Sequence, residues 1–475
     1  MSPAHGSYDV VVIGSGPNGL AAAIVAARRG LSTVVFESRH TIGGGVRSAE
    51  LTLPGFVHDV CSSVHPMAAA SPFFRELPLS AHGLEWITPR VAVAHPLDGG
   101  DAVLLHNDLE RTADELGADR ARYLAGVGAL ARRWSDIEAD VLAPLRFPQH
   151  PVSFARFAVP ALLPAQAYAR LAFSTVRARA LFAGCAAHSM VPLSYAGSAA
   201  IALALAAVGH AHGWPIARGG SQSITNALEA HLRSLGGEIV TGIAVKDREQ
   251  LPNAQQILFD TSPRVMAEIL GHRLPARYSR TLRQYRHGPG VFKIDWALSA
   301  PIPWQARACQ DAATVHVGGT LEEIAESEAG PWREECAKRP FVLVTQPSIF
   351  DRSRAPGSGH TAWGYCHVPN GSTEDMTERI EAQVERFAPG FREVIKARAT
   401  QSPATFEREN ANLVGGDIGG GANVLPNLLF RPTWRTYRTP VRGFYLCSAA
   451  TPPGAGVHGM CGYHAALRAL GPELQ

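Results

Sequence analysis

A glycine-rich segment near the N-terminus constrains the fold of this chain more than any other feature. The apolar run Asp9 to Ile13 leads into GSGPNG at residues 14 to 19, and an alanine-rich stretch and a second apolar run, Ser32 to Phe36, follow. This order is typical of a strand, a tight turn, a helix and a second strand, and it matches the GxGxxG pattern of dinucleotide-binding folds. A chance glycine-rich turn would lack these flanks, so we predict a Rossmann-like α/β unit.

The residue types in this segment suit a dinucleotide. Gly14 permits the tight turn, Gly16 lets the backbone approach a pyrophosphate, and Gly19 lets the helix pack closely on the strand. The N-terminus of the helix offers free N–H groups and the positive end of its dipole to the phosphates. Glu37 lies 18 residues after Gly19, where a carboxylate can accept a hydrogen bond from a ribose hydroxyl.

Two further glycine-containing segments favour FAD over NAD as the dinucleotide. The segment Gly43-Gly44-Gly45-Val46-Arg47 follows the ribose acid, and its glycines let the main chain lie flat against a second large moiety. The turn from Pro452 to Met460 opens a C-terminal helix, whose N-terminal dipole would stabilise negative charge on a reduced flavin. The alternative for both segments is that their glycines only allow the turns of a loop and contact no cofactor.

The C-terminal turn contains a second GxGxxG match, at residues 454 to 459. Only 16 residues follow it, too few for a second strand and its ribose acid. We therefore expect one dinucleotide-binding domain, the N-terminal one, and no separate NAD(P)H domain. This expectation favours a quinone, O2 or another membrane acceptor over bound NAD(P) as the electron acceptor.

The overall composition narrows the classes of partner. Among 475 residues the formal net charge is +3, and the basic residues are nearly all arginine, with lysine only at 246, 293, 338 and 396. No basic run or stripe stands out, so we do not expect nucleic-acid binding. The seven cysteines are scattered without a CxxC pair, which argues against disulphide-reductase chemistry and against metal ligation. Because there is also no recognisable signal peptide, we expect a cytoplasmic setting. The oligomeric state is left open.

The pattern along the chain predicts two interleaved domains. We assign residues 1–75, 215–275 and 406–475 to the dinucleotide domain, and residues 76–214 and 276–405 to a substrate domain. The segment 76–214 is expected to be helical and apolar, and 276–405 carries short strand-like runs such as Gly290 to Leu298. We expect a helix from Gln222 to Leu235, a strand from Glu238 to Val240, and a last strand from Gly443 to Cys447, followed by a helix from Gly459.

The stretch Phe154 to Phe173 is apolar, but Arg156, Pro160, Pro164 and Arg170 interrupt it, so it is too broken to span a bilayer. The interpretation we favour is a buried helix pair in the substrate domain. The alternative is a surface patch that contacts a membrane and admits a lipid substrate.

Several stretches resemble one family of flavoproteins. VVIGSGPNGLAAA, TIGGGVRSAELTLPGFVHDVCSSVHP, GWPIARGGSQSITNALEAHLRSLGGEI, LFDTSPR, GGDIGGG and FRPTWRTYRTPVRGFYLCSAATPPGAGVHGMCGYHAA resemble the phytoene-desaturase-related FAD-dependent oxidoreductases. Within them the chain is most similar to the branch of pyridine nucleotide-disulphide oxidoreductase domain-containing protein two. The resemblance covers the dinucleotide domain nearly end to end and the substrate domain thinly.

The resemblance implies a Rossmann-like FAD-binding domain of the glutathione-reductase or amine-oxidase type, interleaved with an α+β substrate domain. It implies FAD contacts from Gly14, Ser15, Gly16, Pro17, Asn18, Gly19, Glu37, Ser38, Arg39, Gly44, Gly45, Val46, Arg47, Ala244, Val245, Ser448, Gly456, Val457 and Met460. The chain departs from the family in the short segment KDREQLPNAQQ after Val245, where the adenine contacts would lie. It also has Cys447-Ser448-Ala449 where many relatives carry an acid after the last strand.

The chemistry expected from these features needs few catalytic side chains. A flavin takes a hydride at N5, and an apolar substrate lying on the ring needs mainly placement and a dry pocket. His65, His367 and His458 are candidates near the flavin, and Trp363 is a candidate for lining an apolar tunnel. A structural role for each, including His360, is the favoured interpretation.

Three functions remain open from the sequence. The first is a FAD-dependent desaturase, dehydrogenase or isomerase that acts on CH–CH groups of an apolar, isoprenoid, carotenoid-like or lipid substrate. The second is a flavin amine oxidase, which an aromatic cage would favour; the C-terminal motif offers only Tyr463 for one. The third is a non-catalytic FAD-binding protein with a role in lipid handling or interaction.

Overall fold

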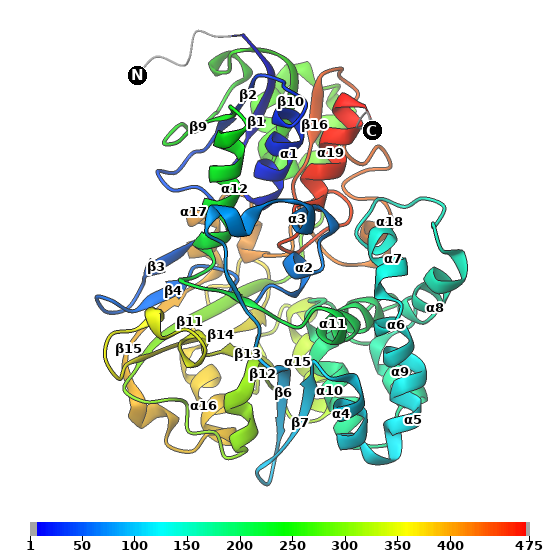
Figure 1. The fold of residues 1–475 in the computed structure, drawn as a ribbon, viewed down its shortest axis with the longest axis vertical. Helices are drawn as coiled ribbons and strands as arrows, with labels where there is room; N and C mark the ends of the chain where they lie inside the picture. The colour runs from blue at the N-terminus through cyan, green and yellow to red at the C-terminus, as the bar shows by residue number, and fades with distance from the viewer. Residues whose placement is uncertain (1–6, 472–475) are drawn as a thin grey trace.

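A five-stranded parallel sheet forms the upper part of the molecule (Figure 1). The structure is a computed structural model that describes residues 7–471. The strands lie in the order β16 (Phe444–Leu446), β10 (Asn253–Phe259), β1 (Ser7–Ile13), β2 (Thr33–Phe36) and β9 (Glu238–Val240). Three distant parts of the chain thus meet in one sheet.

Alternation along β1 explains how helices cover both faces of this sheet. Val10 and Val12 pack into one apolar cluster, whereas Val11 and Ile13 pack into another on the opposite face, because successive strand side chains point to opposite sides. The first face is covered by α1 (Pro17–Ala27), α12 (Gln222–Ser234) and α19 (Met460–Leu470), and the second by α13 (Pro263–Leu270) and α14 (Ala276–Arg283). The fold is therefore a Rossmann-like α/β domain, as the sequence predicts.

A seven-stranded, mainly antiparallel sheet lies below it (Figure 1). Its strand order is β15 (Ile395–Gln401), β11 (Gly290–Leu298), β14 (His360–Val368), β13 (Val342–Thr345), β12 (Ala312–Val317), β6 (Val91–Leu97) and β7 (Asp101–His106). Phe292, Ile294 and Trp296 of β11 pack in a cluster with residues of α16 (Thr377–Phe387). The opposite face of β11 carries Lys293 and Asp295, both buried.

Helices form a lobe beside the second sheet (Figure 1). They are α4 (Leu109–Glu115), α5 (Arg120–Tyr123), α6 (Ala129–Ala131), α7 (Trp134–Val141), α8 (Pro151–Ala161), α9 (Ala165–Ala172), α10 (Val176–Ala187) and α11 (Ala199–Ala211). The segment 76–214 is largely helical as expected, but the expectation overlooked β6 and β7, which lie in this segment and join the large sheet. The strand β6 has the short apolar sequence VAVAHPL and is buried on both faces, so its pattern resembles a buried helix segment as much as a strand.

Short elements connect these units. The hairpin of β3 (Ser48–Glu50) and β4 (Val57–Asp59) and the pair of β5 (Trp86–Ile87) and β8 (Ile216–Ala217) lie outside the two main sheets. The remaining helices that matter below are α2 (Pro66–Ala69), α3 (Pro72–Glu76), α15 (Leu321–Ala329), α17 (Pro403–Glu409) and α18 (Leu425–Leu429). The domain limits given above stay a prediction.

The apolar stretch 154–173 forms the expected helix pair, α8 and α9, but only one face of it is buried. Phe157 and Ala165 pack into the core of the lobe, whereas Val159 and Leu171 are exposed. Among residues 7–471, no helix combines the length and the apolar content needed to cross a membrane.

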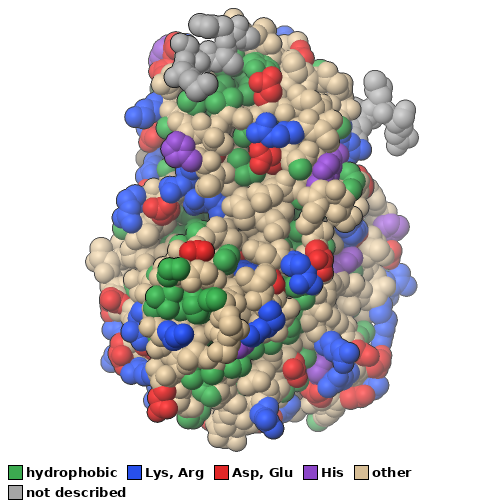
Figure 2. All heavy atoms as spheres, turned by 60° about the vertical axis from the view of Figure 1, so that its left-hand side comes forward, with side chains coloured by type: hydrophobic (Ala, Val, Ile, Leu, Met, Phe, Trp, Pro, Cys, Tyr) green, Lys and Arg blue, Asp and Glu red, His purple; other side chains and the backbone are tan. Residues whose placement is uncertain are grey.

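Surface charge is mixed on the face shown in Figure 2. Arginine and lysine side chains there are interspersed with acidic ones and do not gather into one stripe. On that face, no continuous basic footprint for a polyanion is visible.

Candidate cofactor and substrate site

A cavity of about 950 Å³ runs from the glycine loop into the space between the second sheet and the helical lobe. At one end it is bordered by Gly16 and Glu37, and at the other by His188 and Leu205. Its volume lies near the upper end of the range for small-molecule sites. One continuous space thus joins the predicted dinucleotide loop to an apolar interior.

The glycine loop is tightly packed against Asp260, the residue that follows β10. A Cβ on Gly16 would lie 2.5 Å from Oδ2 of Asp260, and a Cβ on Gly19 would lie 2.1 Å from the Gly14 carbonyl oxygen. Gly14 itself has φ +98°, which residues with a side chain rarely adopt. All three glycines are therefore required by the protein's own packing, in addition to any bound phosphate.

Asp260 is a site residue to which the sequence analysis gave no role. Its Oδ2 accepts a hydrogen bond from the Gly19 N–H at 2.9 Å. Burial raises the pKa of its carboxyl to about 7, and nearby Glu37 acts in the same direction. The position directly after a strand, at the carboxyl edge of the parallel sheet, is the signal that could have identified it.

Glu37 borders the cavity and organises the loop around it. Its Oε2 accepts hydrogen bonds from the backbone N–H and the hydroxyl of Ser15, at 3.0 and 2.6 Å. Its Oε1 accepts from the Arg39 N–H at 2.9 Å and the Ser38 hydroxyl at 3.1 Å. A ribose hydroxyl at Glu37 would therefore take the place of one of the two serine hydroxyls.

The second glycine segment packs its backbone against the first. A Cβ on Gly44, which has φ +57°, would lie 3.3 Å from the Gly16 Cα. Arg47 does not border the cavity and donates from Nε to the Gly44 carbonyl at 2.8 Å. The segment thus leaves a narrow passage bordered by Gly44, Gly45 and Val46.

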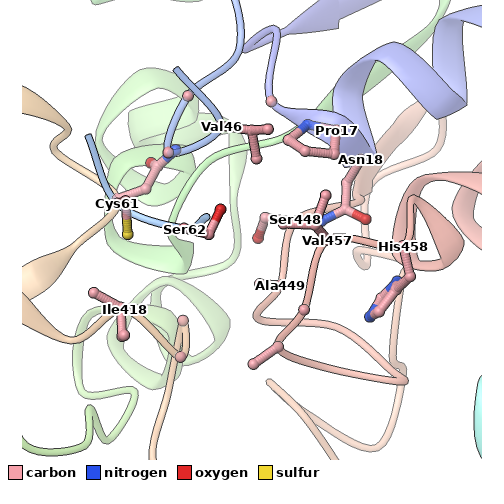
Figure 3. Close-up of a pocket in the computed structure, with 18 of the residues that line it drawn as sticks. Pro17, Asn18, Val46, Cys61, Ser62, Ile418, Ser448, Ala449, Val457 and His458 are labelled. Atoms are coloured by element: carbon pink, nitrogen blue, oxygen red, sulfur yellow. The ribbon is translucent and has the colours of Figure 1, made fainter. Parts of the chain in front are cut away.

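The C-terminal turn closes the opposite side of this passage. Figure 3 shows Val46 and Pro17, Cys61 and Ser62, and Ser448 and Val457 arranged around one open space. The Met460 N–H, which begins α19, donates to Nδ1 of His458 at 3.0 Å. This first N–H of the helix is therefore already bonded within the protein.

Most of the predicted cofactor residues border the cavity: Gly14, Ser15, Gly16, Pro17, Asn18, Glu37, Ser38, Arg39, Gly44, Gly45, Val46, Ala244, Val245, Ser448, Gly456 and Val457. Gly19, Arg47 and Met460 do not border it. Ala244 and Val245 lie in an irregular segment after β9 and not in a strand. The contacts of all these residues with a cofactor stay a prediction.

The three candidate histidines have different surroundings. His65 borders the cavity, and its Nε2 is 2.9 Å from the Ser221 hydroxyl; burial lowers its pKa to about 4. His458 also borders the cavity, and burial likewise lowers its pKa to about 4. His367 does not border it, and its Nδ1 lies 2.6 Å from Glu328. His65 and His458 are therefore neutral at pH 7.

A buried charged cluster lies behind Cys61. Arg354 pairs with Asp59 at 2.8 Å, and Lys293 pairs with Asp295; all four side chains are at most 1% exposed. His58 sits among them, and burial with the nearby cations Lys293 and Arg354 lowers its pKa to about 3. The sequence feature that could have indicated this cluster is the pair Lys293 and Asp295, two charges on one face of a strand that is otherwise apolar.

Cys61 presents its sulfur to the cavity (Figure 3). Burial raises the pKa of its thiol to about 11, although Lys293 and Arg47 oppose this. The thiol is therefore protonated at neutral pH, which removes thiolate chemistry from this position.

The inner arm of the cavity is apolar and aromatic. Trp363 and Tyr365 of β14 stack with ring centroids 5.6 Å apart and planes at 18°. Leu205, Trp214 and Leu343 line the same cavity. Trp363, a candidate for lining an apolar tunnel although a structural role was the favoured interpretation, borders the cavity; its indole N–H has no partner among the described residues.

Known proteins resemble this chain in sequence and in fold. The model of the NAD(P)-binding Rossmann-like domain matches residues 12–77. The chain is 25% identical to pyridine nucleotide-disulfide oxidoreductase domain-containing protein 2 of Mus musculus, over 97% of this chain and 92% of that protein. It is 37% identical to a limonene dehydrogenase polypeptide of Castellaniella defragrans over 23% of this chain and 19% of that polypeptide. The solved structure of putrescine oxidase bound to putrescine has a TM-score of 0.64 at 16% identity, covering 97% of this chain and 98% of that one.

These similarities agree with the geometry. The chain has a flavin-type oxidoreductase fold that is similar to those of amine oxidases, with a Rossmann-like dinucleotide-binding domain. It is homologous to pyridine nucleotide-disulfide oxidoreductase domain-containing protein 2, yet it lacks the CxxC pair of a disulphide reductase.

Proposed function

We propose that this protein is a FAD-dependent oxidoreductase that removes hydride from a C–H bond of an apolar isoprenoid or lipid substrate. The observation that carries the proposal is one continuous cavity, which starts at the dinucleotide loop and ends between apolar and aromatic side chains. We place the chain in the phytoene-desaturase-related group on the sequence resemblance. The local match to a limonene dehydrogenase polypeptide agrees with an apolar substrate.

The residues around the cavity suit FAD. The glycine loop and the N-terminus of α1 would hold its pyrophosphate, and Glu37 would hold the ribose. The absence of side chains at Gly44 and Gly16 would leave room for a flat ring system between them and Val457, which all border the cavity. When bound, FAD accepts a hydride at its N5 atom.

The protein's own residues would orient the substrate and exclude water from the cavity. Leu205, Trp214 and Leu343 line the arm with apolar surface, which excludes water and orients a hydrocarbon chain. The substrate loses one hydride and one proton, and we propose a quinone or O2 as the final electron acceptor. His65, neutral at pH 7, is a candidate for receiving that proton.

The role of His65 has a direct test. If it accepts the proton, His65→Ala lowers turnover by about 100-fold, a typical size for one acid–base group, while FAD stays bound. Turnover that is unchanged in the FAD-loaded variant eliminates this role for His65.

An amine oxidase is the second candidate, because the stacked Trp363 and Tyr365 form an aromatic pair in the cavity. The carboxylates that border the cavity weigh against an ammonium substrate. Within residues 7–471, Asp140 is paired with Arg146 and Glu409 with Arg39. Glu37 and Asp260 are bonded to Ser15 and Gly19 of the glycine loop, where the cofactor would lie, so none of the four offers an ammonium an unpaired counter-charge in the apolar arm.

One experiment separates the candidates. The purified protein is made anaerobic and mixed with isoprenoids and carotenoids, acyl compounds or amines, while the visible absorbance of its flavin is followed. Bleaching by an isoprenoid, carotenoid or acyl compound is expected. Bleaching by amines alone would favour an amine oxidase, bleaching by none of them a non-catalytic role, and purification without flavin would refute the cofactor.

We further propose that one face of the helical lobe rests on a membrane surface. Phe147, Val152 and Leu171 are 85, 72 and 76% exposed, which is unusual for side chains of this kind. Leu145 is also exposed and borders the cavity, so the apolar face is continuous with the cavity. The exposed Arg156 lies on α8, the helix of Val152, and suits anionic headgroups. Arg170 on α9, the helix of Leu171, is paired with Glu322 at 3.3 Å.

The membrane proposal is tested by sedimentation with vesicles of phosphatidylcholine and phosphatidylglycerol. Phe147→Glu should weaken binding about tenfold or more, since a buried aromatic side chain contributes about 2 kcal/mol. Ala276→Glu, an exposed position at the start of α14, carries the same charge change and should bind like the wild type. Equal binding of both variants would refute this docking face.

A further inference from the structure

The inner arm of the cavity contains one imidazole pair that the proposed chemistry does not use. His188, the residue after α10, borders the cavity beside Leu205 and Trp214. Its Nε2 lies 2.9 Å from Nε2 of His316 on β12. The pair is enclosed by aromatic rings, with His188 edge-on to Trp214 at 5.6 Å and His316 edge-on to Phe341 at 5.5 Å.

His316 is tightly packed. It is fully buried, and a Cβ on Gly184 of α10 would lie 2.6 Å from its Nδ1. This Nδ1 has no partner among the described residues. The absence of a side chain at residue 184 therefore lets α10 press against His316 and fix its outer nitrogen toward His188.

Both imidazoles are neutral at pH 7. Burial lowers the pKa of His188 to about 3, and burial together with His188 and His95 lowers that of His316 well below its usual value. Two neutral rings that meet through their Nε2 atoms share one proton in this hydrogen bond. The Nδ1 of His188 is then a donor in one tautomer pair and an acceptor in the other.

Such a pair matches one kind of ligand group. A hydroxyl can donate to or accept from His188, and a carbonyl can accept from it, whereas an ammonium finds no counter-charge among neutral rings. A pure hydrocarbon would leave the polar edge of His188 desolvated without a partner, which is unfavourable. Trp363, 6% exposed, adds an unpartnered N–H on the same cavity, and a donor of this kind also requires an oxygen acceptor.

We propose that His188, oriented by His316, determines specificity for an apolar substrate that carries one uncharged oxygen group, a hydroxyl or a carbonyl. The inference deepens the proposed function and rests on it, because it concerns the same cavity. His188 binds the oxygen and is not required for removal of the hydride.

The test compares three isoprenoids of equal chain length: myrcene, geraniol and geranylamine. Each is titrated into the FAD-loaded protein, and binding is read from the change in tryptophan fluorescence, since Trp214 and Trp363 line the cavity. Geraniol should bind at least about tenfold more tightly than myrcene, and geranylamine should bind more weakly than geraniol.

Two variants address the pair. His188→Leu should bind geraniol and myrcene equally, and His188→Gln, which retains a donor and an acceptor, should restore part of the preference. Gly184→Ala displaces His316 without entering the cavity and should also reduce the preference for geraniol. His210→Leu is the matched control, because His210 is bonded to Tyr123 at 2.7 Å and does not border the cavity; circular dichroism and retained flavin verify folding.

The outcomes separate this inference from the function on which it rests. Equal binding of myrcene and geraniol to the wild type, or a geraniol preference that persists in His188→Leu, overturns the role of His188 and leaves an apolar substrate in place. Binding of geranylamine in preference to both, or of none of the three, overturns the proposed function and the inference with it. If His188→Leu does not fold, Gly184→Ala tests the inference instead: a reduced preference for geraniol supports it, and an unchanged preference overturns it.

Discussion

The carboxyl group of Asp260 makes the stability of this protein depend on pH in a defined direction. Burial raises its folded-state pKa to about 7, whereas an aspartate in an unfolded chain titrates near 3.9. Between about pH 5 and pH 7 the folded protein therefore holds one proton that the unfolded chain has lost. Stability consequently falls as the pH rises through this range and changes little above the folded pKa.

The size of the effect follows from these values. One proton over two pH units corresponds to about 3 kcal/mol, at about 1.4 kcal/mol per unit. An unfolding entropy of about 2.1 cal/mol/K per residue gives about 1 kcal/mol/K for the 475 residues. The melting temperature of the wild type should thus fall by about 3 °C more, from pH 5 to pH 8, than that of Asp260→Asn. The asparagine keeps an acceptor for the Gly19 N–H but cannot titrate.

The assay is thermal unfolding of the FAD-free protein, followed by circular dichroism at intervals from pH 5 to pH 8. A second readout is FAD affinity in the same buffers, since an ionised Asp260 at the N-terminus of α1 would repel a pyrophosphate. Affinity for the wild type should decrease with rising pH, and that of Asp260→Asn should stay constant. If the melting temperatures of the two proteins change equally with pH across this range, the reasoning about Asp260 is refuted.

Two other substitutions test the packing of the site. Gly16→Ala would place a methyl group 2.5 Å from Asp260 Oδ2 and should abolish retention of FAD on purification. The control Gly288→Ala, whose Cβ would lie 3.5 Å from its nearest atom, should purify with flavin. Flavin in both variants would contradict this expectation. Arg354→Met should lower the free energy of unfolding by about 3–5 kcal/mol, because Asp59 would be left buried and unpaired. Adding Asp59→Asn should recover more than half of that loss in urea unfolding, and no recovery would show that the ion pair is not the cause.

Much of the dinucleotide domain is predictable because its signals are local. The strand β1, the turn at Gly14 and the helix α1 follow one another without interruption, and the glycine pattern marks the turn between an apolar run and an alanine-rich stretch. The predicted elements β9, β11, α12 and α19 agree with the structure to within about two residues. The strands β6 and β7 were missed because a short apolar run resembles a buried helix segment as much as a strand.

The candidate site is less predictable than the domain that holds it. Arg47 lies within the glycine segment, yet its guanidinium turns back to the Gly44 carbonyl. His367 lies on the same strand as Trp363, but its side chain pairs with Glu328 away from the cavity. Neither outcome follows from spacing, because the direction of a side chain depends on partners supplied by other elements.

The sequence by itself determined the Rossmann-like unit, since GSGPNG, its flanking strand and helix and the acid at 37 lie within one continuous stretch. Only the tertiary structure decided what surrounds that unit. Asp260 meets Gly19 across 241 residues, Arg354 meets Asp59, and His188 meets His316 across 128 residues. Hydrophobic periodicity records which face of an element is buried, but it does not record which distant face packs against it. The glycine loop can therefore be predicted from the sequence. The buried charges and the His188–His316 pair in the apolar arm form only when the two sheets and the helical lobe come together.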